Sequence, residues 1–137
     1  MTDRELLELA KEARQRAYTP YSHFRVGAAL LTKEGKVYQG CNIENAAYGP
    51  TNCAERTAFF TAVYEGERQF EAIAIAGGPE QETGDDTCAP CGICRQVMME
   101  FCDPQQFRVI LADREQGCRS YRLAELLPLG FGPKDLA

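Results

Sequence analysis

The residues from 72 to 76, Ala-Ile-Ala-Ile-Ala, form an apolar run with no polar interruption. A strand with one face in water alternates apolar and polar side chains, whereas a strand that is buried on both faces is apolar throughout. The run therefore predicts a strand that lies inside a sheet and is covered on both sides. Helices from elsewhere in the chain must supply these two covers.

Hydrophobic periodicity and turn residues place further elements around this run. In chain order, the expected elements are a helix over 3–17, strands over 26–32 and 36–42, a helix over 52–65, the strand over 72–76, a helix over 91–101, strands over 108–112 and 118–122, and a short helix over 123–127. The link between the last two strands is too short for a parallel crossover, so they must form an antiparallel hairpin. The sequence thus predicts an α/β fold with three α-β-α layers around a mixed five-stranded sheet.

Two local signals refine this outline. Thr2 and Glu5 form a possible capping box at the start of the first helix. Gly27, within the first expected strand, has no side chain and is expected to let another element pack closely against the backbone.

The 137 residues contain no internal repeat and no interdomain linker, which predicts a single domain over residues 1–137. Lys and Arg number 15 against 20 Asp and Glu, and the net charge of −5 argues against a nucleic-acid partner. No apolar stretch approaches the roughly 20 residues that cross a bilayer, so no membrane insertion is expected. The first residues also lack the charged-then-apolar layout of a secretion signal, and we expect a cytoplasmic location.

Seven cysteines are many for a chain of this length: Cys41, Cys53, Cys88, Cys91, Cys94, Cys102 and Cys118. An odd number of cysteines in a cytoplasmic chain does not suggest a framework of disulfides. Cys91 and Cys94 have the Cys-x-x-Cys spacing, which by itself is compatible with metal binding and with redox chemistry.

Another cysteine motif, Cys53-Ala54-Glu55, begins the expected helix over 52–65, and Pro90-Cys91-Gly92-Ile93-Cys94 begins the helix over 91–101. The combination of His or Cys, any residue and Glu with Pro-Cys-x-x-Cys marks the zinc-dependent nucleobase deaminases. Two adjacent helices can bring three thiolates to one zinc ion per chain, and three ligands leave the fourth tetrahedral position for water. The predicted zinc ligands are therefore Cys53, Cys91 and Cys94.

Glu55 stands two residues after a predicted ligand, so its carboxylate can point at the open coordination position. There it would take a proton from the zinc-bound water and pass it to a ring nitrogen and then to the leaving amine. Three thiolates on a dication leave a net negative charge, which opposes formation of a zinc-bound hydroxide. The two helix N-termini and Arg56, which can donate hydrogen bonds to the thiolates, are expected to offset it. The predicted reaction is hydrolytic deamination of an aminopyrimidine-like ring.

Four segments carry a family resemblance: residues 21–29 (Tyr-Ser-His-Phe-Arg-Val-Gly-Ala-Ala), 41–49 (Cys-Asn-Ile-Glu-Asn-Ala-Ala-Tyr-Gly), 52–58 (Asn-Cys-Ala-Glu-Arg-Thr-Ala) and 90–96 (Pro-Cys-Gly-Ile-Cys-Arg-Gln). Together they resemble the small homotetrameric zinc-dependent cytidine deaminases, and the likeness covers nearly the whole chain. The resemblance implies a cytidine deaminase-like fold and hydrolysis of the nucleosides cytidine and deoxycytidine to uridine and deoxyuridine in pyrimidine salvage. It also implies a homotetramer whose active sites are shared between subunits.

The resemblance further implies six substrate-binding residues: Phe24, Asn42, Glu44, Tyr48, Ala54 and Phe131. In that family, the residues that match Asn42 and Glu44 bind the ribose hydroxyls, and the residue that matches Phe24 lies against the pyrimidine. The backbone at the position of Ala54 assists in holding the base. The phenylalanine in the place of Phe131 reaches the active site of a neighbouring subunit.

Three positions depart from the family pattern. Arg25 stands where the family usually has proline, and Ala89 stands where a serine often precedes Pro-Cys-Gly. Pro50 is unusual in the loop that carries Tyr48. The first departure affects the stiffness of the loop near Phe24.

Simpler interpretations are also open for several of these residues. Cys88, three residues before Cys91, can serve as a fourth ligand and close the site into a structural zinc module. Cys91 and Cys94 also suit a thiol redox protein, and the substrate can be another aminopyrimidine nucleoside such as blasticidin S. Asn42 and Glu44 can also be ordinary turn residues, and Phe24, Tyr48 and Phe131 can be ordinary core or interface residues.

Overall fold

The computed structural model describes all residues from 1 to 137. Its elements follow the predicted order: helix α1 (Asp3–Ala13), strands β1 (Phe24–Thr32) and β2 (Val37–Cys41), helix α2 (Ala54–Tyr64), strand β3 (Phe70–Pro79), helix α3 (Gly92–Phe101), strands β4 (Arg108–Asp113) and β5 (Gly117–Arg122), and helix α4 (Leu123–Leu126). Short 3-10 turns follow α1 at Arg14–Arg16 and lie near the C-terminus at Pro133–Asp135. None of the helices has the length and apolar character that crossing a membrane requires.

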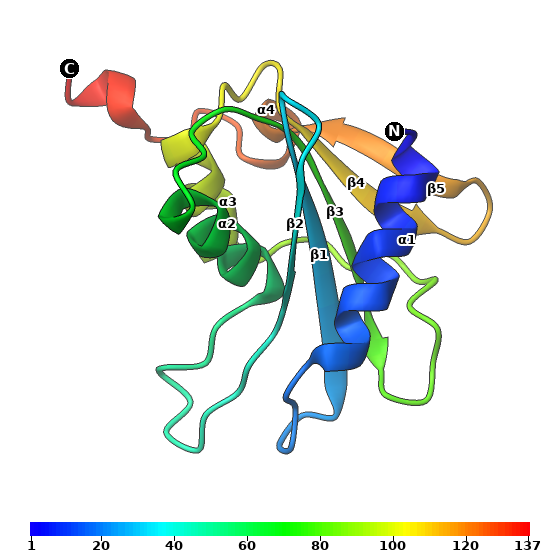
Figure 1. The fold of residues 1–137 in the computed structure, drawn as a ribbon. Coiled ribbons are helices and arrows are strands. Elements are labelled where there is room, and N and C mark those ends of the chain that lie inside the picture. The colour runs from blue at the N-terminus through cyan, green and yellow to red at the C-terminus, as the bar shows by residue number, and fades with distance from the viewer.

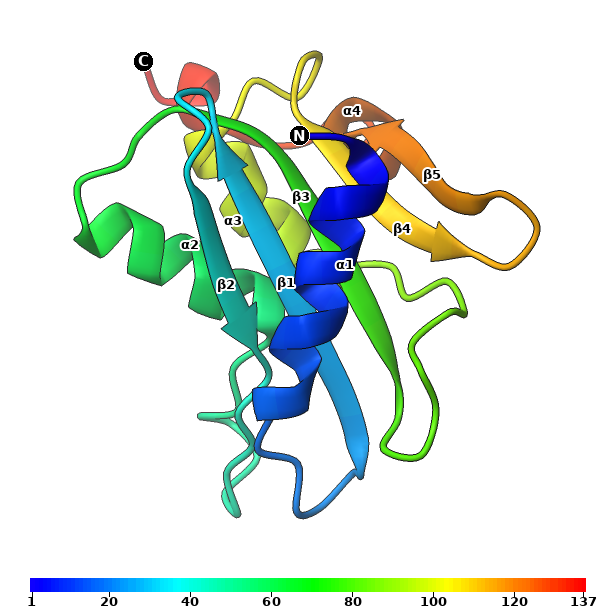
Figure 2. The same ribbon diagram turned by 45° about the vertical axis from the view of Figure 1, so that its right-hand side comes forward.

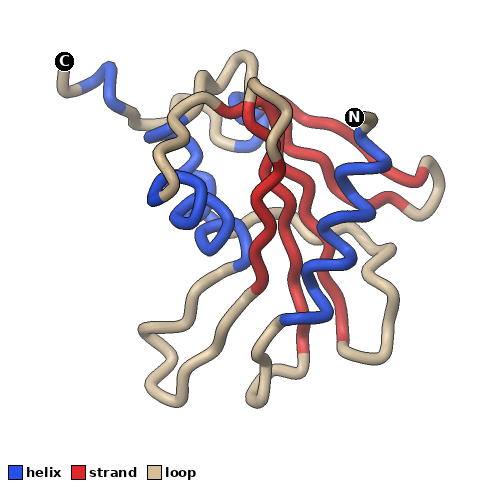
Figure 3. Tube along the Cα trace, viewed as in Figure 1, coloured by secondary structure: helices blue, strands red, loops and turns tan.

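All five strands join one sheet in the order β2-β1-β3-β4-β5 (Figure 1; Figure 3). Strand β1 is antiparallel to β2 and β3, β4 is parallel to β3, and β5 is antiparallel to β4. The parallel pair is connected through α3, because parallel neighbours need a crossover connection. The prediction of a mixed five-stranded sheet is confirmed.

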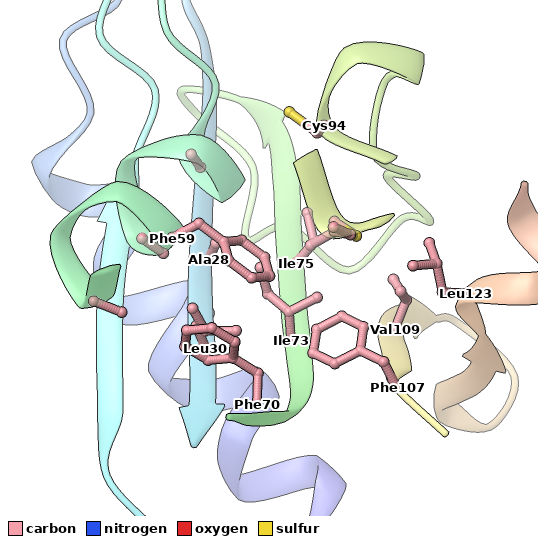
Figure 4. Close-up of a cluster of buried hydrophobic side chains, with 14 of the residues drawn as sticks. Ala28, Leu30, Phe59, Phe70, Ile73, Ile75, Cys94, Phe107, Val109 and Leu123 are labelled. Carbon is pink, nitrogen blue, oxygen red and sulfur yellow. The ribbon is translucent and has the colours of Figure 1, made fainter. Parts of the chain in front are cut away.

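Helices cover both faces of the sheet: α1 lies on one face, and α2 and α3 lie on the other (Figure 1; Figure 2). Alternate side chains of the 72–76 run of β3 point to opposite faces of the sheet, so the run contacts both helix layers. Its alanines pack in the cluster that includes α1, and such small side chains let the helix lie close to the sheet. Its isoleucines pack on the opposite face with Phe59, Phe70 and Phe107 (Figure 4). The expectation of a strand covered on both sides is therefore confirmed.

Two glycines allow helices to touch the backbone of the sheet. A Cβ atom at Gly27 of β1 would lie 2.1 Å from the carbonyl oxygen of Ala10 in α1, so the expected close approach is confirmed. On the opposite face, a Cβ atom at Gly40 of β2 would lie 2.5 Å from the carbonyl oxygen of Ala54, the first residue of α2. No side chain fits at either position. Gly40 thereby determines how closely the start of α2 approaches the sheet.

Helix α1 and strand β3 differ in extent from the prediction. Thr2 and Glu5 do form the capping box, but α1 ends at residue 13, because the chain tightens into a 3-10 turn and Ala17 is extended. At this point the guanidinium of Arg14 is buried and donates hydrogen bonds to carbonyl oxygens at the end of β3. Strand β3 extends to Pro79, beyond the apolar run, because its last residues pair with the start of β1.

The loops before β1 and after β2, residues 17–23 and 42–53, lie at the same end of the sheet as the first turn of α2 (Figure 1). An isolated antiparallel bridge between Ile43 and Asn52 ties the two sides of the second loop together. The segment over 80–91 runs from β3 past α1, where Asp85 forms an ion pair with Lys11, and then reaches the start of α3 (Figure 1). The segments that resemble a known family therefore converge at one end of the molecule.

Candidate metal centre and active site

Three cysteines come together at the N-termini of α2 and α3. Cys53 is the N-cap of α2, Cys91 is the N-cap of α3, and Cys94 lies in the first turn of α3. Their Sγ atoms all lie within 4.8 Å of one another, and those of Cys53 and Cys91 are 3.8 Å apart. A tetrahedral zinc ion with Zn–S bonds of about 2.3 Å places its sulfur ligands about 3.8 Å apart. The donor set and its spacing therefore fit zinc.

Positive charge surrounds these sulfur atoms. Both helices direct their N-termini, which carry a partial positive charge, toward the cluster. Arg56 Nη2 donates a hydrogen bond of 3.3 Å to the Sγ atom of Cys53, and Arg56 Nε is buried with no partner of its own. A hydrogen bond from the Cys94 thiol, followed by the one from Arg56, lowers the pKa of Cys53 to about 5. This shift favours the Cys53 thiolate, the form that binds metal.

Glu55 is the second residue of α2 and is buried, with 4% of its surface exposed. Burial raises the pKa of its carboxyl group to about 7, while hydrogen bonds from its own backbone N–H and from Cys94 act in the opposite direction. The carboxyl group shares the first turn of α2 with Cys53 and lies close enough to the Cys53 and Cys94 thiols for both to influence its pKa. A carboxyl group in this place can exchange a proton with a molecule held beside the sulfur cluster.

Cys88 does not belong to the group of clustered sulfur atoms. It packs against β3, where its Sγ would lie 2.5 Å from a Cβ atom at Gly77. Burial raises the pKa of the Cys88 thiol to about 11, so the thiol keeps its proton at neutral pH. The structure does not form the closed four-cysteine site. The chain has no disulfide, and three further thiols are partly buried: Cys41, Cys102 and Cys118.

Asn42 follows β2 and joins that strand to the start of β1. Its Oδ1 atom accepts a hydrogen bond of 2.9 Å from the backbone N–H of Val26, and its Nδ2 atom donates one of 2.9 Å to the carbonyl oxygen of Phe24. The amide group keeps one N–H and one acceptor position for a further partner. Asn42 is therefore both a structural link and a free hydrogen-bonding group.

Glu44 holds the turn that precedes β1. Its Oε1 atom accepts hydrogen bonds from the backbone N–H groups of Tyr21 (3.0 Å) and Ser22 (3.1 Å), and its Oε2 atom accepts one from the Ser22 hydroxyl. The Ser22 hydroxyl is the largest of the causes that lower the pKa of Glu44. An open depression of about 380 Å³ adjoins this carboxylate and is lined by Tyr21, Ser22, Glu44, Tyr48 and Thr51.

The aromatic residues at the predicted site are not core residues. Phe24, Tyr48 and Phe131 are 40%, 73% and 56% exposed. Tyr48 lies in a turn with a φ angle of 63°, and its ring meets that of Tyr21 edge to face. The carbonyl oxygen of Phe131 accepts a hydrogen bond of 2.7 Å from Gln96, so α3 holds the tail that carries this phenylalanine. All three rings are therefore accessible to a ligand or to another chain.

Two residues at this end of the fold were not found by sequence reasoning. Ser22 lies within the segment over 21–29, but a single serine in a turn is an ordinary loop residue. Arg14 lies on α1's extension, and the groups that it bonds are backbone carbonyl oxygens. Neither the residue type nor the sequence spacing distinguishes Ser22 or Arg14 from residues without a role near the site.

Comparison with known proteins identifies the family of this chain. Residues 1–110 match the family model of the cytidine and deoxycytidylate deaminase zinc-binding region. The chain belongs to this family. A curated cytidine deaminase of Sporosarcina psychrophila is 47% identical over 133 residues, which cover 97% of this chain and 93% of that relative.

Solved structures of family members agree with the fold described above. A crystal structure of cytidine deaminase from Burkholderia pseudomallei is 49% identical and matches with a TM-score of 0.85 over 96% of this chain and 100% of its own. The enzyme from Mycobacterium tuberculosis is 36% identical, with a TM-score of 0.78 over 93% of this chain and 95% of its own. The expected α/β fold, the zinc cofactor and the hydrolase class are confirmed.

Proposed function

We propose that the chain hydrolyses cytidine and deoxycytidine to uridine and deoxyuridine, using one zinc ion held by Cys53, Cys91 and Cys94. One observation carries the proposal: a buried carboxyl group, that of Glu55, stands at the start of α2 beside a cluster of three sulfur atoms whose spacing suits zinc. The names of the relatives at 47% and 49% identity support the choice of substrate. A closed structural zinc module would need a fourth protein ligand, and it would leave Glu55 without a role.

Glu55 moves the protons of the reaction. When bound, the zinc ion supplies Lewis-acid activation of a water molecule. The Glu55 carboxylate accepts a proton from the attacking water and delivers it to N3 of the pyrimidine, and a second proton follows to the amino group on C4. A C–O bond forms at C4 and the C–N bond there breaks, so that water is consumed and ammonia leaves. Because Glu55 is buried, solvent does not compete for these protons.

We assign the sugar to Asn42 and Glu44. A carboxylate has about four acceptor positions, and groups of the chain occupy three of those on Glu44. The remaining position suits one sugar hydroxyl, and the spare N–H and acceptor position of Asn42 suit another. The negative charge of Glu44 also disfavours a nucleotide, because it repels a phosphate group.

The base and the outer part of the substrate are assigned to four further groups. Phe24 offers an exposed ring for the face of the pyrimidine, and the backbone at Ala54, in the first turn of α2, lies beside Glu55. Tyr48 lines the depression next to Glu44. Phe131 extends from the C-terminal tail and is assigned to the active site of a neighbouring subunit.

The assignment of Phe131 makes a homotetramer with shared active sites part of the proposal. Exposed apolar side chains on α2 and the tail support contacts between copies: Phe60 is 49% exposed, Tyr64 is 86% exposed, and Leu129 is fully exposed. We further propose that residues 1–137 act as a single domain in the cytoplasm, in pyrimidine salvage.

Substitution of Glu55 by glutamine tests the mechanism. Glu55→Gln should retain one zinc ion per chain and its melting temperature, and should deaminate cytidine slower by about 10²-fold or more, because the proton carrier is lost. Glu65→Gln, at the exposed C-cap of α2, is the matched control and should behave as wild type. Normal turnover by Glu55→Gln would refute the mechanism.

A substrate panel tests the specificity. Zinc content and ammonia release are measured with cytidine, deoxycytidine, cytosine, CMP and blasticidin S. We expect turnover of the first two only. Turnover of blasticidin S without cytidine would overturn the substrate assignment, and turnover of CMP would contradict the role of Glu44.

A further inference from the structure

We infer that Ser22 is a positioning residue that couples recognition of the sugar to recognition of the base. The inference rests on the proposed function, because it takes Glu44 and Phe24 as nucleoside-binding residues. The Ser22 hydroxyl accepts a hydrogen bond of 3.0 Å from the backbone N–H of Phe24 and donates one to Oε2 of Glu44. A single hydroxyl group thus connects the two residues.

Ser22 also determines which way Glu44 presents its free acceptor position. It supplies two of the three hydrogen bonds on this carboxylate, one from its backbone N–H to Oε1 and one from its hydroxyl to Oε2. Because each oxygen is held, the carboxylate cannot rotate without losing a bond. The hydroxyl bond also helps to keep Glu44 ionised, so that Glu44 accepts hydrogen bonds and does not donate them.

The backbone of Phe24 is held from both sides by residues assigned to the sugar. Its N–H is bonded to Ser22, and its carbonyl oxygen is bonded to Asn42. The position of the exposed Phe24 ring therefore depends on the same turn that orients Glu44. Loss of the Ser22 hydroxyl would release the first of these two anchors and one of the three bonds on Glu44.

Ser22 makes no hydrogen bond with Glu55 or with the clustered cysteines, so its removal should affect binding and not proton transfer. Ser22 is exposed, and water can partly replace its hydroxyl. We therefore expect Ser22→Ala to raise the KM for cytidine roughly fivefold, which is less than the roughly tenfold or larger effect of a hydrogen bond to a charged group that water does not replace. The kcat, the zinc content and the melting temperature should stay at wild-type values.

Two control variants separate this role from a general effect of the substitution. Ser22→Thr retains the hydroxyl and should restore the wild-type KM. Ser120→Ala removes the other serine of the chain, which is exposed on β5, and should change nothing. The dissociation constant of uridine, measured by calorimetry without turnover, should rise in Ser22→Ala by the same factor as KM.

A nucleoside that lacks the 2′- and 3′-hydroxyls of the sugar isolates the contribution of Glu44. The increase in KM caused by Ser22→Ala should be smaller for 2′,3′-dideoxycytidine than for cytidine. An unchanged KM, a lower kcat at constant KM, or an equal increase for both nucleosides would overturn the inference. A wild-type protein that neither deaminates cytidine nor binds uridine would instead refute the proposed function itself.

Discussion

Substitution of Gly40 by alanine tests whether the contact between β2 and α2 determines the geometry of the active site. The added Cβ atom would lie 2.5 Å from the carbonyl oxygen of Ala54 and 2.5 Å from the nitrogen of Ala58. Ordinary van der Waals contact begins at 3.4 Å, so the start of α2 must move away from β2 by the difference, about 0.9 Å. Both atoms belong to the helix backbone, and no side-chain rotation can relieve the clash.

The displacement should cost both stability and activity. Overpacking typically lowers the free energy of unfolding by about 1–3 kcal/mol, and a clash with backbone belongs at the upper end of that range. The same movement changes the position of Cys53 and Glu55 relative to Cys91 and Cys94, which stand on a different helix. Because misplacement by about 1 Å at a reacting centre can cost about 10²-fold, we expect a loss of that order in kcat/KM for cytidine.

Leu7→Ala is the control for the loss of stability alone. Leu7 is buried in α1 on the opposite face of the sheet, and its truncation should cost about 2–5 kcal/mol without moving α2. Urea denaturation, zinc content and kcat/KM are measured for both variants at one protein concentration and at a temperature where both are folded. If Gly40→Ala loses no more activity than Leu7→Ala, the contact at Gly40 does not determine the geometry of the site.

Three other substitutions test individual contacts of the site. Arg56→Gln removes the hydrogen bond to Cys53 and should speed the loss of zinc to a chelator by about tenfold, whereas retention as in wild type would contradict a role in stabilising the thiolate. Cys88→Ser should keep one zinc ion per chain and full activity, and loss of zinc would identify Cys88 as a ligand. Phe131→Ala should raise KM several-fold at constant zinc content, and an unchanged KM would argue against a contact between subunits.

The arrangement of the sheet was predictable only where it depends on local patterns. The apolar run over 72–76 indicated a strand covered on both faces, and the short link over 113–117 required an antiparallel hairpin. The order of the strands was not predictable. Strand β1 lies between β2 and β3, and the pairing of β1 with β3 joins residues that are far apart in the chain. A single sequence contains no pattern that reports such a pairing.

The zinc site was predictable from sequence motifs, whereas the contacts around it were not. The clustering of Cys53, Cys91 and Cys94 was predictable, because Cys-x-Glu and Pro-Cys-x-x-Cys at two helix starts together match a known zinc-binding pattern. The bonds of Ser22 and Arg14 were not, because they involve backbone groups, which every residue carries. Cys88 was open as a fourth ligand because it lies close to Cys91 in sequence, but it packs against Gly77 and not in the sulfur cluster.

Contacts that do not involve the metal fix the first turn of α2. Gly40 lets this turn lie against β2, the backbone of Asn52 pairs with Ile43 in both directions, and Asn52 Nδ2 donates a hydrogen bond of 3.1 Å to Thr57. In small structural zinc modules the ion itself supplies the folding energy, and the apo form is unfolded. Here the buried core and these contacts hold Cys53 and Glu55 in place. Contacts of this kind suit a catalytic centre, because stability that does not come from the metal is compatible with a coordination position left open beside the three clustered sulfur atoms.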